Sequence, residues 1–287
     1  MTKIETAMVL AAGYGTRLKP LTDALPKPLV PVAGRPMIEY ALDKLQSYGV
    51  GEIVVNVSHL KEQLVAHLAT RKKPGGEASQ PRIKISEEAE PLETGGGLKK
   101  AQPLLGNKPA FVINSDIIWT DEPQQTSPSP PRSGGEGRGE VAGFGEHSTF
   151  NIQHSTSGEV PVETSSRGET ALARLARHWD DTKMDFLLLA QPKAKAVGHD
   201  KGEDHLFIRR ENTIGWNDND APYIIAGIGI FHPRVLRAAP DGKFSVKILW
   251  HEALARKRLF CLPHHGRWFQ TGTLEDIRKA EEQLKAG

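Results

Sequence analysis

The 287-residue chain has a single cysteine, no excess of charge of either sign and no long apolar run. Cys261 alone cannot form an internal disulfide, which fits a reducing compartment and leaves burial as its expected role. The 37 basic and 35 acidic residues give a net charge of +2, which speaks against a nucleic-acid partner. No apolar stretch reaches the roughly 18 residues of a membrane span and no signal-peptide core is present, so we expect a soluble, cytoplasmic protein without a membrane partner.

Several familiar site patterns are also missing. The P-loop string G-x-x-x-x-G-K-[ST] does not occur, and the dinucleotide fingerprint is incomplete because Leu18 stands where its third glycine would be. No cluster of cysteine and histidine would hold zinc, and no hydrolase triad is evident. Any nucleotide site in this chain must therefore be built in another way.

What is present is a glycine-rich string directly after an apolar segment. Residues 8–31 read MVLAAGYGTRLKPLTDALPKPLVP. Small residues after a strand let backbone N–H groups approach an anion, and Arg17 and Lys27 add the positive charge that a polyphosphate needs. The pattern indicates a nucleoside triphosphate site; the alternative is an ordinary turn with a surface Arg and Lys. The candidate nucleotide-binding residues in the string are Leu10, Ala11, Ala12, Gly13, Gly15 and Thr16.

The fold is predicted from alternating strand-like and helix-like segments. Strands are expected at 4–10, 52–57, 83–85 and 111–113, and helices at 37–47, 60–69 and 96–105. Such alternation predicts an α/β fold, a Rossmann-like, doubly wound and mostly parallel sheet in a single domain. Ligands of such sheets bind beyond the carboxyl ends of the strands.

The second half of the chain is expected to begin with an insertion. Residues 122–170 are rich in Pro, Gly and Ser and have almost no apolar periodicity, so they cannot offset their ordering entropy. We predict a disordered, inert surface insertion there, with a functional disordered segment as the alternative. The remaining expected elements are helices at 171–175, 247–255 and 274–285, the last with Thr273 as its N-cap, and strands at 185–190, 207–210 and 223–231.

Further candidates carry polar chemistry near the ends of these elements. Asp116 ends an apolar strand, where it either binds Mg²⁺ or caps a turn. The Glu88 carboxylate either accepts an N–H of a nucleobase or is solvated in the run Glu87-Glu88. The string that starts at Glu93 and Thr94 and continues with Gly95 reads as a sugar-and-ribose loop with exposed backbone amides. Additional sugar-side candidates are Asn114, Asp204 and Gly227.

Several of these strings together resemble one enzyme family. They are LAAGYGTRLKPLT at 10–22, PKPLVPV at 26–32, ETGGG at 93–97, NSD at 114–116, AGI at 226–228 and WFQTGT at 268–273. The chain is similar to the sugar-phosphate nucleotidyltransferases, also called NDP-sugar pyrophosphorylases. Within this family, residues 90–97 and the short length resemble most the uridylyltransferases acting on N-acetylmuramate 1-phosphate, followed by small mannose-1-phosphate guanylyltransferases.

The resemblance implies a Mg²⁺-dependent transfer from an NTP, expected to be UTP, to a sugar 1-phosphate, expected to be N-acetylmuramate 1-phosphate, in bacterial cell-wall recycling. Arg17 would contact the β- and γ-phosphates, Lys27 would lie between the two anions, and Asp116 would bind the metal. Family members supply a second metal-binding Asp from a W-x-D-x-G-T motif, where this chain has Gln270. Alternatives are a mannose-1-phosphate guanylyltransferase, a non-catalytic nucleotide-sugar-binding homologue, or a chain damaged by the insertion. No oligomeric state is predicted.

Overall fold

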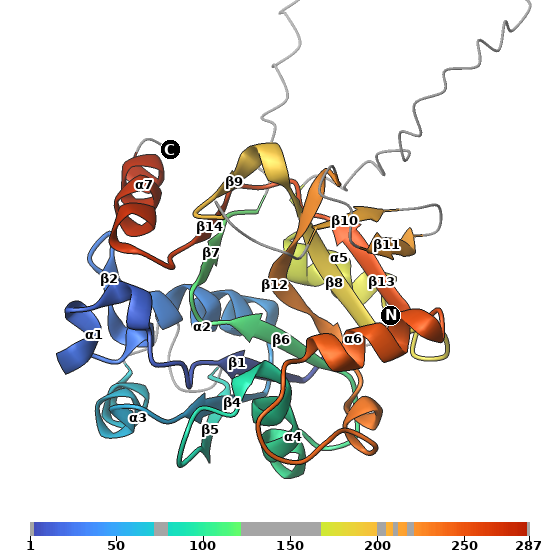
Figure 1. Ribbon diagram of the computed structural model, residues 1–287, viewed down its shortest axis with the longest axis horizontal. Helices are drawn as coiled ribbons and strands as arrows, with labels where there is room; N and C mark the ends of the chain where they lie inside the picture. Colours follow the sequence, from blue (N-terminus) through green and yellow to red (C-terminus); the bar gives the residue numbers. More distant parts are fainter. Residues whose placement is uncertain are drawn as a thin grey trace, which may run out of the picture.

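A nine-stranded mixed sheet runs through the middle of the protein (Figure 1). The computed structural model describes residues 3–71, 80–121, 168–199, 205–208, 212–216 and 221–285. Apart from residues 168–170, the predicted insertion lies outside this part, as does Asp204. The strand order is β11-β10-β12-β6-β1-β4-β5, and β8 joins β12 to β13. The strands are β1 (Thr6–Leu10), β4 (Glu52–Val57), β5 (Arg82–Glu87), β6 (Ala110–Asn114), β8 (Phe186–Pro192), β10 (His205–Ile208), β11 (Ile214–Trp216), β12 (Tyr223–Phe231) and β13 (Leu259–Pro263).

The sheet has a parallel half and a half joined to it by antiparallel pairing. β5, β4, β1 and β6 pair in parallel, as strand–helix–strand crossovers require. β12 then pairs antiparallel with β6 and with β8, and β8 pairs in parallel with β13. The α/β, doubly wound architecture predicted from the sequence is confirmed, and the second half of the chain adds the antiparallel pairs.

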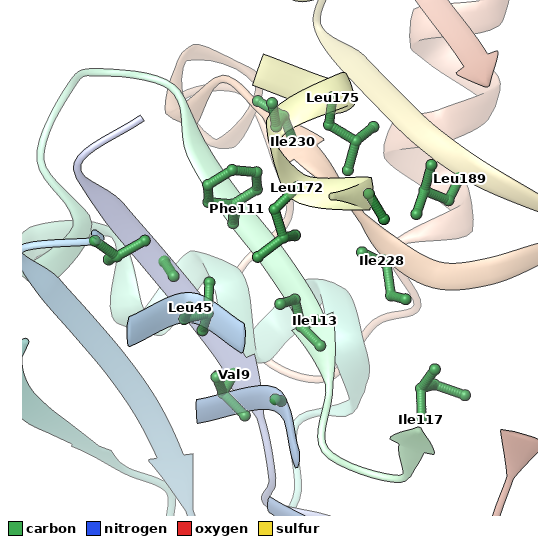
Figure 2. Packing of buried hydrophobic residues seen from close by; sticks show 14 of the residues in the cluster. Val9, Leu45, Phe111, Ile113, Ile117, Leu172, Leu175, Leu189, Ile228 and Ile230 are labelled. Carbon is green, nitrogen blue, oxygen red and sulfur yellow. The ribbon is translucent and has the colours of Figure 1, made fainter. Parts of the chain in front are cut away.

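Helices cover both faces of the sheet, because its central strands are apolar on both sides. One buried cluster lies under α2 (Met37–Tyr48), α3 (Lys61–Thr70) and α5 (Ala171–His178). Figure 2 shows Leu45 of α2 and Leu172 and Leu175 of α5 on the same side of the strands. A second cluster lies under α4 (Glu93–Leu105) and α6 (Lys247–Ala255) on the opposite face.

A small three-stranded sheet beside the main one completes the fold. It has the order β7-β14-β9 and packs with α7 around a third apolar cluster. Thr273 is the N-cap of α7, as predicted. Its Oγ1 accepts a hydrogen bond from the Asp276 N–H at 3.2 Å, and the Asp276 carboxylate accepts one from the Thr273 N–H at 2.8 Å. The remaining elements are β7 (Ile117–Trp119), β9 (Ala196–Val197), β14 (Trp268–Gln270), α7 (Leu274–Lys285), α1 (Leu21–Ala24), the hairpin β2 (Pro31–Val32) with β3 (Arg35–Pro36), and the 3₁₀ turns η1 (Thr16–Leu18), η2 (Lys27–Leu29), η4 (Lys193–Lys195) and η6 (Pro233–Leu236). In the part of the chain that the structure describes, no helix is both long and apolar enough to cross a membrane.

Candidate active site

The glycine-rich turn leaves the sheet at the carboxyl end of β1. The Ala11 N–H donates to the Asn56 side-chain oxygen at 2.7 Å, so the turn is fixed to the neighbouring strand β4. Gly15 has a left-handed backbone, φ 65°, and a Cβ there would lie 2.9 Å from the Lys27 Cβ. The glycine therefore allows Lys27 to approach the turn.

Lys27 and Asp116 form an ion pair next to this turn. Their Nζ and Oδ2 atoms are 2.5 Å apart, and their side chains are only 14% and 17% exposed. Asp116 lies in the turn between β6 and β7, and its backbone carbonyl accepts hydrogen bonds from the N–H and the hydroxyl of Thr271. Lys27 and Asp116 are 89 positions apart in the sequence. They meet because η2, the β6–β7 turn and the residue after β14 come together at this point.

A cavity of about 210 Å³ joins the turn and the ion pair. Its lining includes most of the residues that the sequence pointed to: Leu10, Ala11, Ala12, Gly13, Lys27, Glu88, Glu93, Thr94, Asn114 and Asp116. A cavity of this size, lined by the small residues of the turn and by one lysine, suits a phosphate chain. Ten of the residues predicted separately along the first 116 positions therefore line one cavity.

Arg17, Gly15 and Thr16 do not line this cavity. Arg17 is exposed on η1, and its guanidinium lies against Gly272, where a Cβ would be 3.1 Å from both terminal nitrogens. Gly272 directly follows Thr271, which is bonded to the Asp116 carbonyl. Arg17 is thus near the Asp116 turn but outside the enclosed space.

Glu88 is buried, so the solvated alternative is wrong. Glu88 is 2% exposed. One carboxylate oxygen accepts a hydrogen bond from the Asn56 amide at 2.7 Å, and the other accepts one from the Leu92 N–H at 2.8 Å. Asn56 therefore links the glycine-rich turn to Glu88. Sequence reasoning missed Asn56, although a lone amide in the apolar strand 52–57 was a usable signal.

The predicted sugar-and-ribose loop is a helix. Glu93 and Thr94 begin α4, and the amides of Gly95 and Gly96 both donate to the Phe244 carbonyl at 3.0 Å rather than lying exposed. A Cβ at Gly95 would lie 2.3 Å from the Phe244 ring, and Gly95 lines neither cavity described in this subsection. The glycines let α4 pack closely against the segment around Phe244. This requirement comes from the tertiary structure, so local composition does not reveal it. Glu93 and Thr94 still line the first cavity.

A second cavity of about 250 Å³ adjoins the first. The two share Leu10, Thr94 and Asn114, and the second also includes Gly227 and Gln270. Gly227 has φ 68°, and a Cβ there would lie 2.9 Å from the Asn114 amide nitrogen. Three of the sugar-side candidates, Thr94, Asn114 and Gly227, therefore converge in this space, with His199, Ser245 and Lys247, which the sequence did not single out.

Comparison with known proteins agrees with this geometry. A family model described as nucleotidyl transferase matches residues 6–130. The N-acetylmuramate alpha-1-phosphate uridylyltransferase of Caulobacter vibrioides is 33% identical over 97% of this chain and 96% of its own length. The chain belongs to the sugar-phosphate nucleotidyltransferases. A mannose-1-phosphate guanyltransferase of Aspergillus fumigatus is 40% identical over 51% of this chain and 40% of its own.

Solved structures show that nucleotidyltransferases share this fold. The crystal structure of a UDP-glucose pyrophosphorylase complexed with UDP-glucose aligns with a TM-score of 0.67 over 99% of both chains, at 17% identity. As a sugar-phosphate nucleotidyltransferase, the protein is an enzyme that joins a nucleotide to a sugar 1-phosphate, and its family usually uses a divalent metal.

Asp116 and Gln270, the residues that the sequence predicts as metal ligands, line the first and the second cavity respectively. Gln270 of β14 pairs with Ile117 of β7, the residue that follows Asp116, so the two residues are close along the chain path of the small sheet. A carboxylate and an amide carbonyl are hard oxygen ligands of the type that Mg²⁺ accepts. Among the residues that the structure describes, no group of three or more His, Cys, Asp or Glu side chains could hold a metal ion. Gln270 Oε1 lies 3.4 Å from His199 Nδ1.

Proposed function

We propose that the enzyme transfers uridylyl from UTP to N-acetylmuramate 1-phosphate and releases pyrophosphate, with Mg²⁺ as cofactor. The observation that carries the reaction is the half-enclosed Lys27–Asp116 pair beside the glycine-rich turn. The choice of base and sugar is supported by the Caulobacter vibrioides relative, which aligns over nearly its whole length.

The chemistry requires two anions to meet. An oxygen of the sugar phosphate forms a bond to the α-phosphorus of the NTP, and the bond from that phosphorus to the pyrophosphate oxygen breaks. Lys27 is placed to leave Asp116 and neutralise the α-phosphate, which reduces repulsion between the two substrates. The amides of the turn hold the triphosphate, and Arg17 contacts the departing pyrophosphate from outside the cavity. Mg²⁺ on Asp116 and Gln270 would supply Lewis-acid stabilisation of phosphate charge.

Two alternatives each have a specific observation in their favour. The 40% identity to a mannose-1-phosphate guanyltransferase over 51% of the chain favours GTP and mannose 1-phosphate. Gln270, which removes a negative charge from the metal site, favours a non-catalytic nucleotide-sugar-binding homologue. The proposal further places the enzyme in the cytoplasm, where UTP is made, and its product in peptidoglycan recycling.

The deciding experiment measures pyrophosphate release by the full chain. UTP, GTP, ATP and dTTP are each combined with N-acetylmuramate 1-phosphate, mannose 1-phosphate and N-acetylglucosamine 1-phosphate, with Mg²⁺ and with EDTA. We expect the highest kcat/KM with UTP and N-acetylmuramate 1-phosphate, and no pyrophosphate release in EDTA. A clear preference for GTP with mannose 1-phosphate would establish the first alternative. Tight UDP-sugar binding without turnover would establish the second.

The Gln270→Asp variant tests the account of the metal site. A carboxylate at this position restores the second charged ligand that the family motif supplies, so we expect tighter Mg²⁺ binding and a several-fold higher kcat at limiting Mg²⁺. Gln270→Glu, which adds the same charge on a side chain one methylene longer than that of Asp, serves as the matched charge control. A clear fall in activity of Gln270→Asp would show that the amide is required as it stands.

A further inference from the structure

Two residues between β14 and α7, Thr271 and Gly272, contact the surroundings of both Asp116 and Arg17. The Asp116 carbonyl accepts hydrogen bonds from the Thr271 N–H at 3.0 Å and from the Thr271 hydroxyl at 2.9 Å. A Cβ on Gly272 would lie 3.1 Å from both terminal nitrogens of Arg17. Adjacent residues of one short segment therefore contact the turn that carries the carboxylate and the guanidinium group.

The Thr271 hydroxyl is buried and donates to the Asp116 turn. Thr271 is 0% exposed, and its hydroxyl oxygen lies 2.9 Å from the Asp116 carbonyl and 3.3 Å from the Met37 sulfur. A hydroxyl has one proton to donate, and a thioether sulfur is only a weak acceptor, so the proton goes to the carbonyl. Both donors of Thr271 thus hold the backbone from which the Asp116 carboxylate projects.

The segment is itself fixed at both ends by regular structure. β14 before it pairs with β7, the strand that follows Asp116, and α7 after it is capped by Thr273. The third apolar cluster joins these elements to η1, with Leu18 of η1 and Phe269 of β14 among its members. Leu18 directly follows Arg17, so the backbone at this arginine packs on the same core as the segment.

In the proposed reaction, Asp116 holds the metal and Arg17 contacts the departing pyrophosphate, so both groups must meet one triphosphate. A misplacement of about 1 Å can cost on the order of 100-fold in rate, because the stabilisation of phosphate charge depends on pre-set geometry. We propose that Thr271 and Gly272 are positioning residues that set the placement of Asp116 and Arg17 relative to each other. Thr271 acts through the Asp116 backbone, and the missing side chain of Gly272 leaves room for the guanidinium group. This inference rests on the proposed function and deepens it.

The first test separates the hydroxyl of Thr271 from the shape of its side chain. Thr271→Val removes the hydroxyl at nearly constant volume, and Thr271→Ser keeps it. We expect Thr271→Val to lower kcat about 10-fold and to raise the Mg²⁺ concentration for half-maximal activity by a similar factor, whereas Thr271→Ser retains most of both. Thr70→Val, which removes an exposed hydroxyl that donates to the Ala66 carbonyl at 3.0 Å, is the matched control and should behave as the unaltered chain. Titration of the enzyme with Mn²⁺, followed by the EPR signal of the free ion, measures metal affinity without turnover.

The second test moves Arg17 without changing its charge. In Gly272→Ala the added methyl group meets the end of an exposed, flexible side chain, so the guanidinium group shifts and the fold is retained. We expect about 10-fold weaker binding of inorganic pyrophosphate in isothermal titration with Mg²⁺ present, and a melting temperature within about 2 °C of the unaltered chain. Gly51→Ala is the matched control, because the nearest atom to its added carbon is the Glu5 carbonyl oxygen at 3.6 Å.

Equal losses of kcat and Mn²⁺ affinity in Thr271→Val and Thr271→Ser would overturn the proposal, because the hydroxyl would then not be the group that acts. Unaltered kcat and Mn²⁺ affinity in Thr271→Val, or unaltered pyrophosphate affinity in Gly272→Ala, would overturn it as well. If no NTP yields pyrophosphate, the proposed function fails, while the expected changes in Mn²⁺ and pyrophosphate binding still support this inference. An unaltered chain that binds neither probe contradicts it.

Discussion

At the scale of single residues, the site depends on buried polar groups that satisfy one another. Asn56 uses its oxygen for the Ala11 N–H and its amide for Glu88, and Glu88 also accepts from Leu92. Asn56 and Glu88 are only 3% and 2% exposed, so each depends on its partner. Removing a shared partner is therefore expected to cost more than one hydrogen bond is worth.

Asn56→Ala should lower the free energy of unfolding by about 2–4 kcal/mol, because it leaves a buried N–H and a buried carboxylate oxygen unsatisfied. Urea unfolding measures this change, and KM for the NTP should rise because the glycine-rich turn loses its anchor. Asn107→Ala, at an exposed turn, is the matched control and should change stability by less than about 0.5 kcal/mol. Equal stability of the two variants would show that Asn56 does not hold the turn.

The buried His264 makes the stability of the fold depend on pH in a direction that follows from its pKa. Its burial lowers the pKa of the imidazole from 6.5 to about 4. Between these values the unfolded chain binds a proton that the native chain does not. The free energy of unfolding therefore falls as the pH decreases from 6.5 and levels off below about 4. The total loss is up to about 3 kcal/mol.

His264→Gln cannot take up this proton. The stability advantage of the unaltered chain over the variant should therefore shrink steadily between pH 6.5 and pH 4.5, measured by urea unfolding at fixed ionic strength. Other titrating groups are common to both proteins and cancel in the difference. A difference that stays constant over this range would mean that the imidazole is protonated equally in both states.

At the scale of elements, β12 brings the sugar side of the site to the nucleotide side. The strand changes its register with β8 between Ile225 and Gly229, and Gly227 lies in this irregular stretch. The left-handed backbone and the short distance to Asn114 both require glycine there. The irregular strand thus places a backbone turn directly against the end of β6.

Gly227→Ala should cost about 2–4 kcal/mol of stability and raise KM for the sugar 1-phosphate, since the added methyl group meets the Asn114 amide. Gly34→Ala is the matched control: it has φ 77°, and no atom lies within 4 Å of the added carbon, so it should cost only about 1 kcal/mol. Thermal unfolding and steady-state kinetics measure the two effects. Equal costs at the two positions would argue against a contact with Asn114.

Elements were predictable where local pattern decides them. The bounds expected for 52–57, 223–231, 247–255 and 274–285 agree with β4, β12, α6 and α7. The helix expected at 96–105 begins three residues earlier, at Glu93, and Gly95 was misread as loop because glycine disfavours helices locally, whereas here close packing against Phe244 requires it. Ser245 and Lys247 were not predicted as site residues, since only the return of α6 to the sheet brings them to Asn114.

At the scale of the whole molecule, the described residues on either side of 122–167 lie together. The Asp121 carboxylate accepts the Ala171 N–H at 2.8 Å and pairs with Lys44 of α2 at 2.5 Å. The chain on either side of the segment is thus already joined by contacts that do not involve it. Of the junction residues that the structure describes, neither Asp121 nor residues 168–171 line either cavity of the active site.

Replacing residues 122–167 with a short Gly-Ser linker should therefore leave fold and activity intact. Closing a shorter loop also costs slightly less entropy, so the melting temperature should be equal or slightly higher. Pyrophosphate release and thermal unfolding measure both effects, and a variant with the segment scrambled at constant composition separates length from sequence. Loss of activity in the shortened and the scrambled chain would assign a function to the segment. Aggregation of the full-length chain, relieved by shortening, would instead identify the insertion as damage to an otherwise competent enzyme.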